Sequence, residues 1–157
     1  MKNFDEKRMH KVFYKEIFSV FENEPYANHL GIQLEEMGEG TASASMAIRE
    51  FMLNSHDTVH GAVLYALADY VFAAASNSYG KTAVGLTTTM NFMAPAKEGD
   101  RIRAKAVEEK RNQRIAWYKI QVFNGEELIA TMEAAGYRKS QYFVPMEELE
   151  GEDKKSK

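Results

Sequence analysis

The chain has 157 residues, of which 45% are hydrophobic and 27% charged, and its formal net charge is −3. This length and balance indicate one soluble domain with a hydrophobic core, and the net negative charge argues against a general nucleic-acid binder. The absence of cysteine excludes disulfides, a thiol nucleophile and cysteine metal sites. The charged N-terminus has no signal-peptide core and the longest apolar segment is interrupted by polar residues, so we expect a cytoplasmic protein.

The N-terminal third of the chain predicts helices followed by a hairpin. Residues 4–22 carry apolar side chains at helical spacing among charged ones, which predicts an amphipathic helix. Pro25 and Gly31 bracket a short helical turn. Alternating residues then predict two strands, over 32–36 and 41–48, around a turn at 38–40.

The stretch from His60 to Tyr79 predicts a long helix, because large apolar residues and alanine recur in it at intervals of three and four. Its other faces are also nearly apolar, which predicts that the helix is surrounded by protein. Asp69 is its one formally charged residue, and no lysine or arginine lies three or four positions away. A buried, unpaired carboxylate is costly, so Asp69 is a candidate functional residue.

The rest of the chain predicts four strands, over residues 82–93, 101–109, 115–123 and 128–138, with a tight hairpin at Asn124-Gly125. Consecutive strands favour an antiparallel sheet in an α+β domain, wrapped around the long helix. The uncovered face or edge of that sheet predicts a homodimer or larger assembly. We expect residues 1–24 to form an N-terminal helix, 25–140 the main domain and 141–157 a charged, disordered tail.

Four features in the same order carry a family resemblance: Asn54 in a loop, His60-Gly61 at the helix start, Leu-Ala-Asp ending at Asp69, and the strand TTTMNFMAP at 87–95. With these, the chain resembles the hotdog-fold acyl-CoA thioesterases of the phenylacetic-acid-degradation (PaaI-like) type over roughly residues 31–139. Ala62 departs from the second glycine usual in the family. The resemblance implies a hotdog fold, a dimer or tetramer, and active sites at the dimer interface built from both subunits.

The resemblance also implies hydrolysis of an acyl-CoA, or a related acyl thioester, to a free acid and a thiol. We expect the Gly61 N–H, at the positive end of the helix, to polarise the thioester carbonyl, and Asp69 to act as general base or as nucleophile. Eight residues advance a helix by about 12 Å, so Gly61 of one subunit is expected to work with Asp69 of the other. Asn54 is expected to orient water or the thioester, and Thr87 to assist the water.

Further residues are expected to bind the substrate: His60, which also shapes the start of the helix, Tyr65 and Phe92 at the acyl group, and Arg138 and Lys139 at the phosphates of coenzyme A. No cofactor is expected apart from the coenzyme A moiety of the substrate, and no nucleic-acid or membrane partner. No metal is expected either, since the sequence from His56 to His60 imitates a zinc motif but lies in a loop, whereas that motif requires a helix.

Each candidate also has a structural interpretation: Asp69 hydrogen-bonded in the core to Tyr65, Gly61 as a close-packing glycine, Asn54 as a turn residue and Thr87 as an ordinary strand residue. Two other functions stay open. One is a non-catalytic acyl-CoA- or lipid-binding hotdog domain, and the other is a hotdog hydratase or dehydratase. Members of the second class pair a histidine with an acidic residue, and His60 and Asp69 lack that spacing on one helix face.

Overall fold

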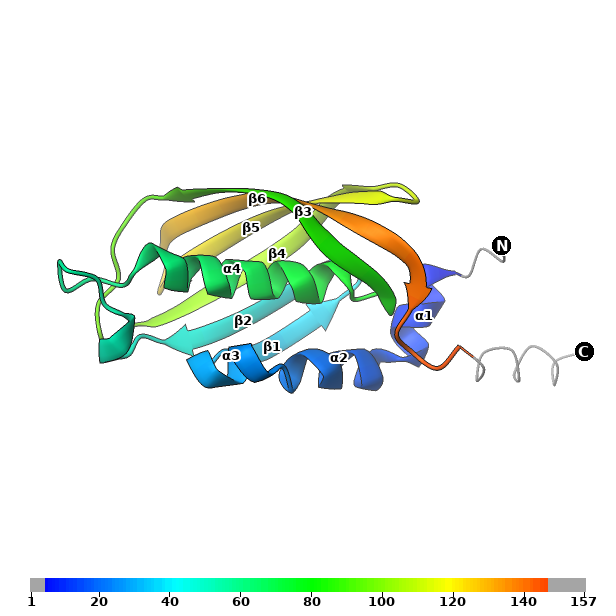
Figure 1. The fold of residues 1–157 in the computed structure, drawn as a ribbon, viewed down its shortest axis with the longest axis horizontal. Helices are drawn as coiled ribbons and strands as arrows, with labels where there is room; N and C mark the ends of the chain where they lie inside the picture. Colours follow the sequence, from blue (N-terminus) through cyan, green and yellow to red (C-terminus); the bar gives the residue numbers. More distant parts are fainter. Residues whose placement is uncertain (1–4, 147–157) are drawn as a thin grey trace, which may run out of the picture.

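A computed structural model describes residues 5–146, and Figure 1 shows their arrangement. The elements in chain order are α1 (Glu6–Val12), α2 (Tyr14–Glu22), α3 (Pro25–Leu30), β1 (Gln33–Gly38), β2 (Thr41–Ala47), the 3-10 helix η1 (Glu50–Met52), α4 (Gly61–Ser76), β3 (Lys81–Phe92), β4 (Arg101–Arg111), β5 (Ile115–Asn124) and β6 (Glu127–Tyr142). The strands form one antiparallel sheet in the order β1-β2-β4-β5-β6-β3. The predicted α+β hotdog fold is confirmed.

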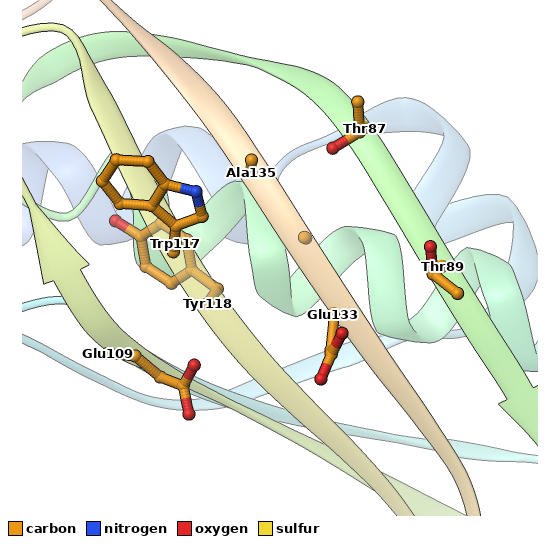
Figure 2. A pocket seen from close by; sticks show the side chains of 8 residues that line it. Thr87, Thr89, Glu109, Trp117, Tyr118, Glu133 and Ala135 are labelled. Carbon is orange, nitrogen blue, oxygen red and sulfur yellow. The ribbon is translucent and has the colours of Figure 1, made fainter.

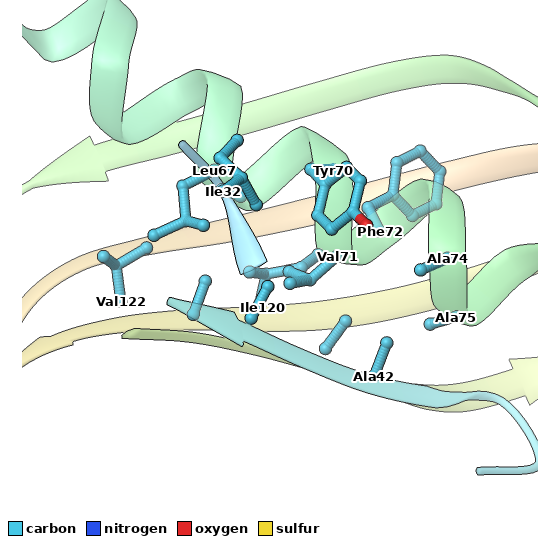
Figure 3. Close-up of a cluster of buried hydrophobic side chains, with 14 of the residues drawn as sticks. Ile32, Ala42, Leu67, Tyr70, Val71, Phe72, Ala74, Ala75, Ile120 and Val122 are labelled. Atoms are coloured by element: carbon cyan, nitrogen blue, oxygen red, sulfur yellow. The ribbon is translucent and has the colours of Figure 1, made fainter. Parts of the chain in front are cut away.

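The sheet curves around α4, which lies in its hollow (Figure 1). Leu67 and Val71 of α4 are completely buried, in the same apolar cluster as Ile120 and Val122 of β5 (Figure 3). Under the helix, β2 and β4 present buried alanines at Ala42, Ala44, Ala104 and Ala106. Small side chains let the helix lie close to the sheet, so the large side chains of α4 fill the remaining space.

The prediction that α4 is covered on every side is wrong for a single chain. Ala62, Tyr65 and Asp69 are exposed. Because they follow one another at intervals of three and four, they form one stripe along the helix, which we call the open stripe of α4. The sheet wraps only part of the circumference of the helix. The large apolar side chains of α4, such as Leu67 and Val71, lie on the side that faces the sheet.

The predicted helix over residues 4–22 is interrupted at Phe13, where α1 ends and α2 begins. Met9, Phe13, Ile17 and Phe21 are all buried. A repeat of four residues drifts by about 40° per step on a regular helix of 3.6 residues per turn. Phe13, with φ −106° and ψ 22°, lies where the regular helical geometry is interrupted, and the buried side chains continue on both sides of it.

At the other end, β6 continues past its expected end at residue 138 to Tyr142, because it pairs with β3 as far as Lys81. Val144 is 7% exposed, so residues directly after β6 still pack on the domain. Residues 147–157 of the expected tail lie outside the described residues, and the boundaries at 24 and 140 remain predictions. Within residues 5–146, no helix has the length and apolar character needed to cross a membrane.

Candidate active site

Asn54 organises the loop that leads into α4. Its Oδ1 accepts a hydrogen bond from the backbone N–H of His56 at 2.8 Å, and its Nδ2 lies 3.0 Å from Thr58 Oγ1. Its backbone N–H donates to the carbonyl of Thr58 at 2.8 Å, and Asp57 adopts a positive φ of 58° in the turn. Asn54 thus shapes the approach to the helix, and its contact with water or substrate stays a prediction.

His60 caps the start of α4 and leaves one backbone donor unused. Its Nδ1 accepts from the N–H of Ala62 at 3.1 Å, and its carbonyl accepts from the N–H of Val63 at 2.9 Å. Because Nδ1 is an acceptor, the proton of the neutral ring lies on Nε2. Among the described residues, the N–H of Gly61 has no acceptor, so an unpaired donor stands at the positive end of the helix dipole.

Phe92 of β3 covers the start of the helix. A side chain at Gly61 would place its Cβ 3.2 Å from the Phe92 ring. Phe92 itself is 56% exposed. The glycine therefore permits close contact between the helix start and an aromatic ring, and the two predicted site residues lie together. The other loop histidine, His56, is exposed, and no group of three His, Asp or Glu side chains within residues 5–146 is placed to hold a metal.

Asp69 lies on the open stripe of α4, two turns after Gly61. Partial burial of its carboxyl raises its pKa above the ordinary value, and no described lysine, arginine or histidine forms an ion pair with it. Tyr65 does not satisfy it, because the Tyr65 hydroxyl is 2.8 Å from Thr88 Oγ1 of β3. Asp69 is therefore an accessible carboxylate without a counter-charge among residues 5–146, and a raised pKa marks it as a candidate functional residue.

The two threonines at 87 and 88 face opposite sides of the sheet. Thr88 pairs in register with the buried Ala134 and bonds Tyr65, so it faces the helix. Thr87 pairs with Ala135 and, as Figure 2 shows, lies with Trp117 along an open groove of about 320 Å³ on the outer face. Thr87 thus faces away from α4 and from Asp69 of its own chain, whereas Thr88 faces the helix and bonds Tyr65.

The sequence contained the signal that separates these threonines. Side chains alternate between faces along a strand, so Thr88 shares a face with Met90 and Phe92, whereas Thr87 does not. Phe92 was expected near the acyl group, and the alternation puts Thr88, not Thr87, on the same face of β3 as Phe92. The register between β3 and β6 shifts between Gly85 and Thr87. Side chains therefore alternate regularly between the two faces only in the part of β3 that follows this shift.

The expectation that Arg138 binds the phosphates of coenzyme A needs correction. Its side chain is 5% exposed, and its guanidinium bonds the carboxylate of Glu6 and, at 2.6 Å, the carbonyl of Asn112. A cation that is buried and paired within the chain is not available to a ligand at the surface. The neighbouring Lys139 points to the other face of β6 and is half-buried, and its role stays a prediction.

Comparison with known proteins places the chain in a family. Residues 56–131 match the family model of the thioesterase superfamily. The chain is 36% identical over 109 residues to the acyl-coenzyme A thioesterase PaaI of Escherichia coli K12, which covers 69% of this chain and 78% of that protein.

Among solved structures, the TT0310 protein of Thermus thermophilus superposes with a TM-score of 0.73 at 36% identity, covering 74% of this chain and 99% of that one. The PaaI protein from the phenylacetic acid degradation operon of E. coli superposes with a TM-score of 0.79 at 29% identity, covering 88% of this chain and 99% of that one. The chain therefore belongs to the thioesterase superfamily, as a PaaI-like hotdog-fold thioester hydrolase.

Proposed function

We propose that the protein hydrolyses acyl-CoA thioesters, with Gly61 and Asp69 as the two centres of the reaction. The observation that carries this proposal is the unused N–H of Gly61 at the start of α4, together with the carboxylate of Asp69 on the open stripe of the same helix. The first group suits a carbonyl oxygen that gains negative charge. The second suits activation of water or direct attack. The similarity to an acyl-coenzyme A thioesterase supports coenzyme A as the carrier.

In the general-base route, Asp69 takes a proton from water while the water oxygen bonds to the thioester carbon. The negative charge that develops on the carbonyl oxygen is stabilised by the Gly61 N–H. Collapse of the tetrahedral intermediate breaks the carbon–sulfur bond, releases the acid, and returns the proton from Asp69 to the thiolate. In the nucleophilic route, the Asp69 carboxylate attacks the thioester carbon, and collapse of the intermediate breaks the carbon–sulfur bond and leaves a mixed anhydride. Water then hydrolyses the anhydride to the free acid and the Asp69 carboxylate, and one proton of that water ends on the thiolate. Both routes use the same two groups.

Two copies of the chain complete each site in this proposal. Gly61 and Asp69 are separated by eight helical residues, about 12 Å along the axis, so within one chain they cannot act on one carbonyl. Strand β3 lies at one edge of the sheet and exposes Val84, Leu86 and Phe92, and Met93 directly after the strand is also exposed. An unpaired edge with exposed apolar side chains, beside the open stripe of α4, suits pairing with a second copy about a two-fold axis. The cytoplasmic location stays a prediction from the sequence.

Replacing Asp69 by Asn tests the proposed function. The expected result is a loss of at least about 100-fold in kcat on acyl-CoA substrates, with unchanged circular dichroism and elution volume. A panel of acetyl-CoA, octanoyl-CoA and benzoyl-CoA, followed with a thiol-reactive dye, samples short, long and aromatic acyl groups. Glu126→Gln, which removes an exposed carboxylate in the β5–β6 turn, is the matched control and should keep wild-type turnover.

The outcomes separate the alternatives. Full turnover by Asp69→Asn contradicts the assignment of Asp69. Binding of the acyl-CoA panel without turnover by the wild type would favour a non-catalytic binding domain, and loss of the enoyl absorbance of crotonyl-CoA without thiol release would favour a hydratase.

A further inference from the structure

The side chain of Tyr65 connects α4 to β3. Its hydroxyl lies 2.8 Å from Thr88 Oγ1 of β3, and the residue is 38% exposed on the open stripe of α4. Side chains on a helix lean toward its N-terminus, so this ring leans toward Gly61. Because the helix backbone holds the ring at one end and the hydrogen bond holds it at the other, the ring has a defined position.

The end of β3 lies along the first turn of α4. An added Cβ at Gly61 would come 3.2 Å from the ring of Phe92, and Thr88 bonds Tyr65. Met90 lies between Thr88 and Phe92 on the same face of the strand and is partly buried against the core. The unpaired N–H of Gly61 therefore stands between two aromatic rings, with Phe92 at the helix start and Tyr65 one turn later.

Tyr65 is also the midpoint between the two groups of the proposed reaction, four residues after Gly61 and four before Asp69. A two-fold axis that brings Gly61 of one subunit to Asp69 of the other also makes the reciprocal contact. The midpoints of the two helical stretches are then no farther apart than the two halves of one site. The two copies of α4 therefore approach each other at Tyr65, with one site on either side.

A ring at this place limits the room for the acyl group. Four residues advance a helix by about 6 Å, which is the length along α4 between Gly61 and Tyr65. An acetyl or benzoyl group fits within this length, whereas an octanoyl chain that runs along the helix meets the two Tyr65 rings. The hydrogen bond to Thr88 keeps each ring from swinging aside.

We propose that Tyr65 is a specificity-determining residue of the hydrolytic site. Its ring, fastened to Thr88, stands between the two sites of the dimer and restricts the substrates to thioesters of short or single-ring acids. This role rests on the proposed function, in which Gly61 and Asp69 of different subunits form each site.

Kinetics with acetyl-CoA, benzoyl-CoA and octanoyl-CoA test the restriction. The wild type should show a lower kcat/KM on octanoyl-CoA than on the other two substrates. Tyr65→Ala should raise the octanoyl-to-acetyl ratio of kcat/KM at least about 10-fold. The gain should come from a lower KM for octanoyl-CoA, with kcat on acetyl-CoA unchanged, because Gly61 and Asp69 remain in place. Thr88→Val keeps the ring but removes its tether, so it should raise the ratio less than Tyr65→Ala does.

The matched control is Tyr137→Ala, which removes a tyrosine of similar exposure, 37%. Tyr137 lies two residues from Ala135 of the outer groove and therefore on the outer face of the sheet. It should leave the octanoyl-to-acetyl ratio unchanged. Circular dichroism and elution volume check that each variant keeps the fold and the assembly of the wild type.

Cross-linking tests the place of Tyr65 without measuring activity. The chain contains no cysteine, so Tyr65→Cys introduces a single thiol per subunit. A bismaleimide with a two-carbon linker should join two such subunits into a covalent dimer on a denaturing gel. In the control Asp69→Cys, the two thiols lie about 12 Å farther apart along the helices, so cross-linking should be much slower because the linker does not span them.

The failures are distinguishable. An unchanged octanoyl-to-acetyl ratio in an active Tyr65→Ala enzyme overturns the role of Tyr65 alone, as does an equal change in Tyr137→Ala or a wild type that prefers octanoyl-CoA. A dimer that Tyr65→Cys does not cross-link overturns the place of Tyr65 between the sites, and this result is obtained even if Tyr65→Ala fails to fold. A wild type that hydrolyses no thioester overturns the proposed function itself.

Discussion

Gly61 has little room for a side chain on the side that faces Phe92. The Cβ of Gly61→Ala would come 3.2 Å from the Phe92 ring, closer than ordinary van der Waals contact. Because the ring is largely exposed and can turn aside, we expect a small change in stability. A methyl group beside the unpaired N–H obstructs the approach of the thioester oxygen, so kcat should fall by about 10- to 100-fold, less than or equal to the loss of a whole oxyanion donor.

The comparison of Gly61→Ala with the double variant Gly61→Ala/Phe92→Ala separates the two effects. Removing the ring relieves the crowding but leaves the methyl group beside the N–H. Kinetics and thermal unfolding on both proteins measure this. Recovery of wild-type kcat in the double variant would show that the glycine serves packing against Phe92, which is the structural interpretation of this residue.

At the scale of elements, α1 is tied to the far end of the sheet by one carboxylate. Glu6 pairs with Arg138 of β6 and with Arg111 of β4 at 3.1 Å, and Lys81 of β3 lies 3.9 Å away. The Glu6 side chain is 18% exposed and that of Arg138 5%, so the pair is largely desolvated. Removing one partner of such a pair leaves the other as an uncompensated buried charge.

Glu6→Ala should therefore lower the free energy of unfolding by about 2–4 kcal/mol, measured by urea denaturation. The neighbouring Lys7 offers the control, because its 3.9 Å pair with Glu39 is exposed, with the Lys7 side chain 69% accessible. An exposed pair contributes at most about 1 kcal/mol, so Lys7→Ala should change stability little. Equal losses in the two variants would mean that the buried cluster does not hold α1.

At the scale of the whole molecule, the question is whether each proposed site combines residues of two subunits or lies within one chain. In a dimer whose sites each combine Gly61 of one subunit with Asp69 of the other, a Gly61→Val subunit and an Asp69→Asn subunit complement each other. Their heterodimer contains one intact site and one site with both defects. Random mixing gives half heterodimers, so co-expression of the two inactive variants should restore about a quarter of the wild-type activity.

Differently tagged copies purified in sequence isolate the heterodimer, which should then show about half of the wild-type kcat per dimer. The control is co-expression of Asp69→Asn with Asp69→Ala, which leaves no intact site and should stay inactive. An isolated heterodimer without activity would contradict a site that combines Gly61 of one subunit with Asp69 of the other.

The sequence by itself determined the elements, the fold class and the spacing of Gly61 and Asp69, because apolar periodicity, turn residues and helix starts are local properties of the chain. The alternation along β3 also indicated that Thr87 and Thr88 face opposite sides of the sheet. Only the tertiary structure decided the environments. Glu6 lies 132 positions from the Arg138 that it neutralises, and the Tyr70 hydroxyl of α4 donates to the carbonyl of Phe21, 49 positions away. Such contacts depend on which elements the fold brings side by side, and no local pattern records them.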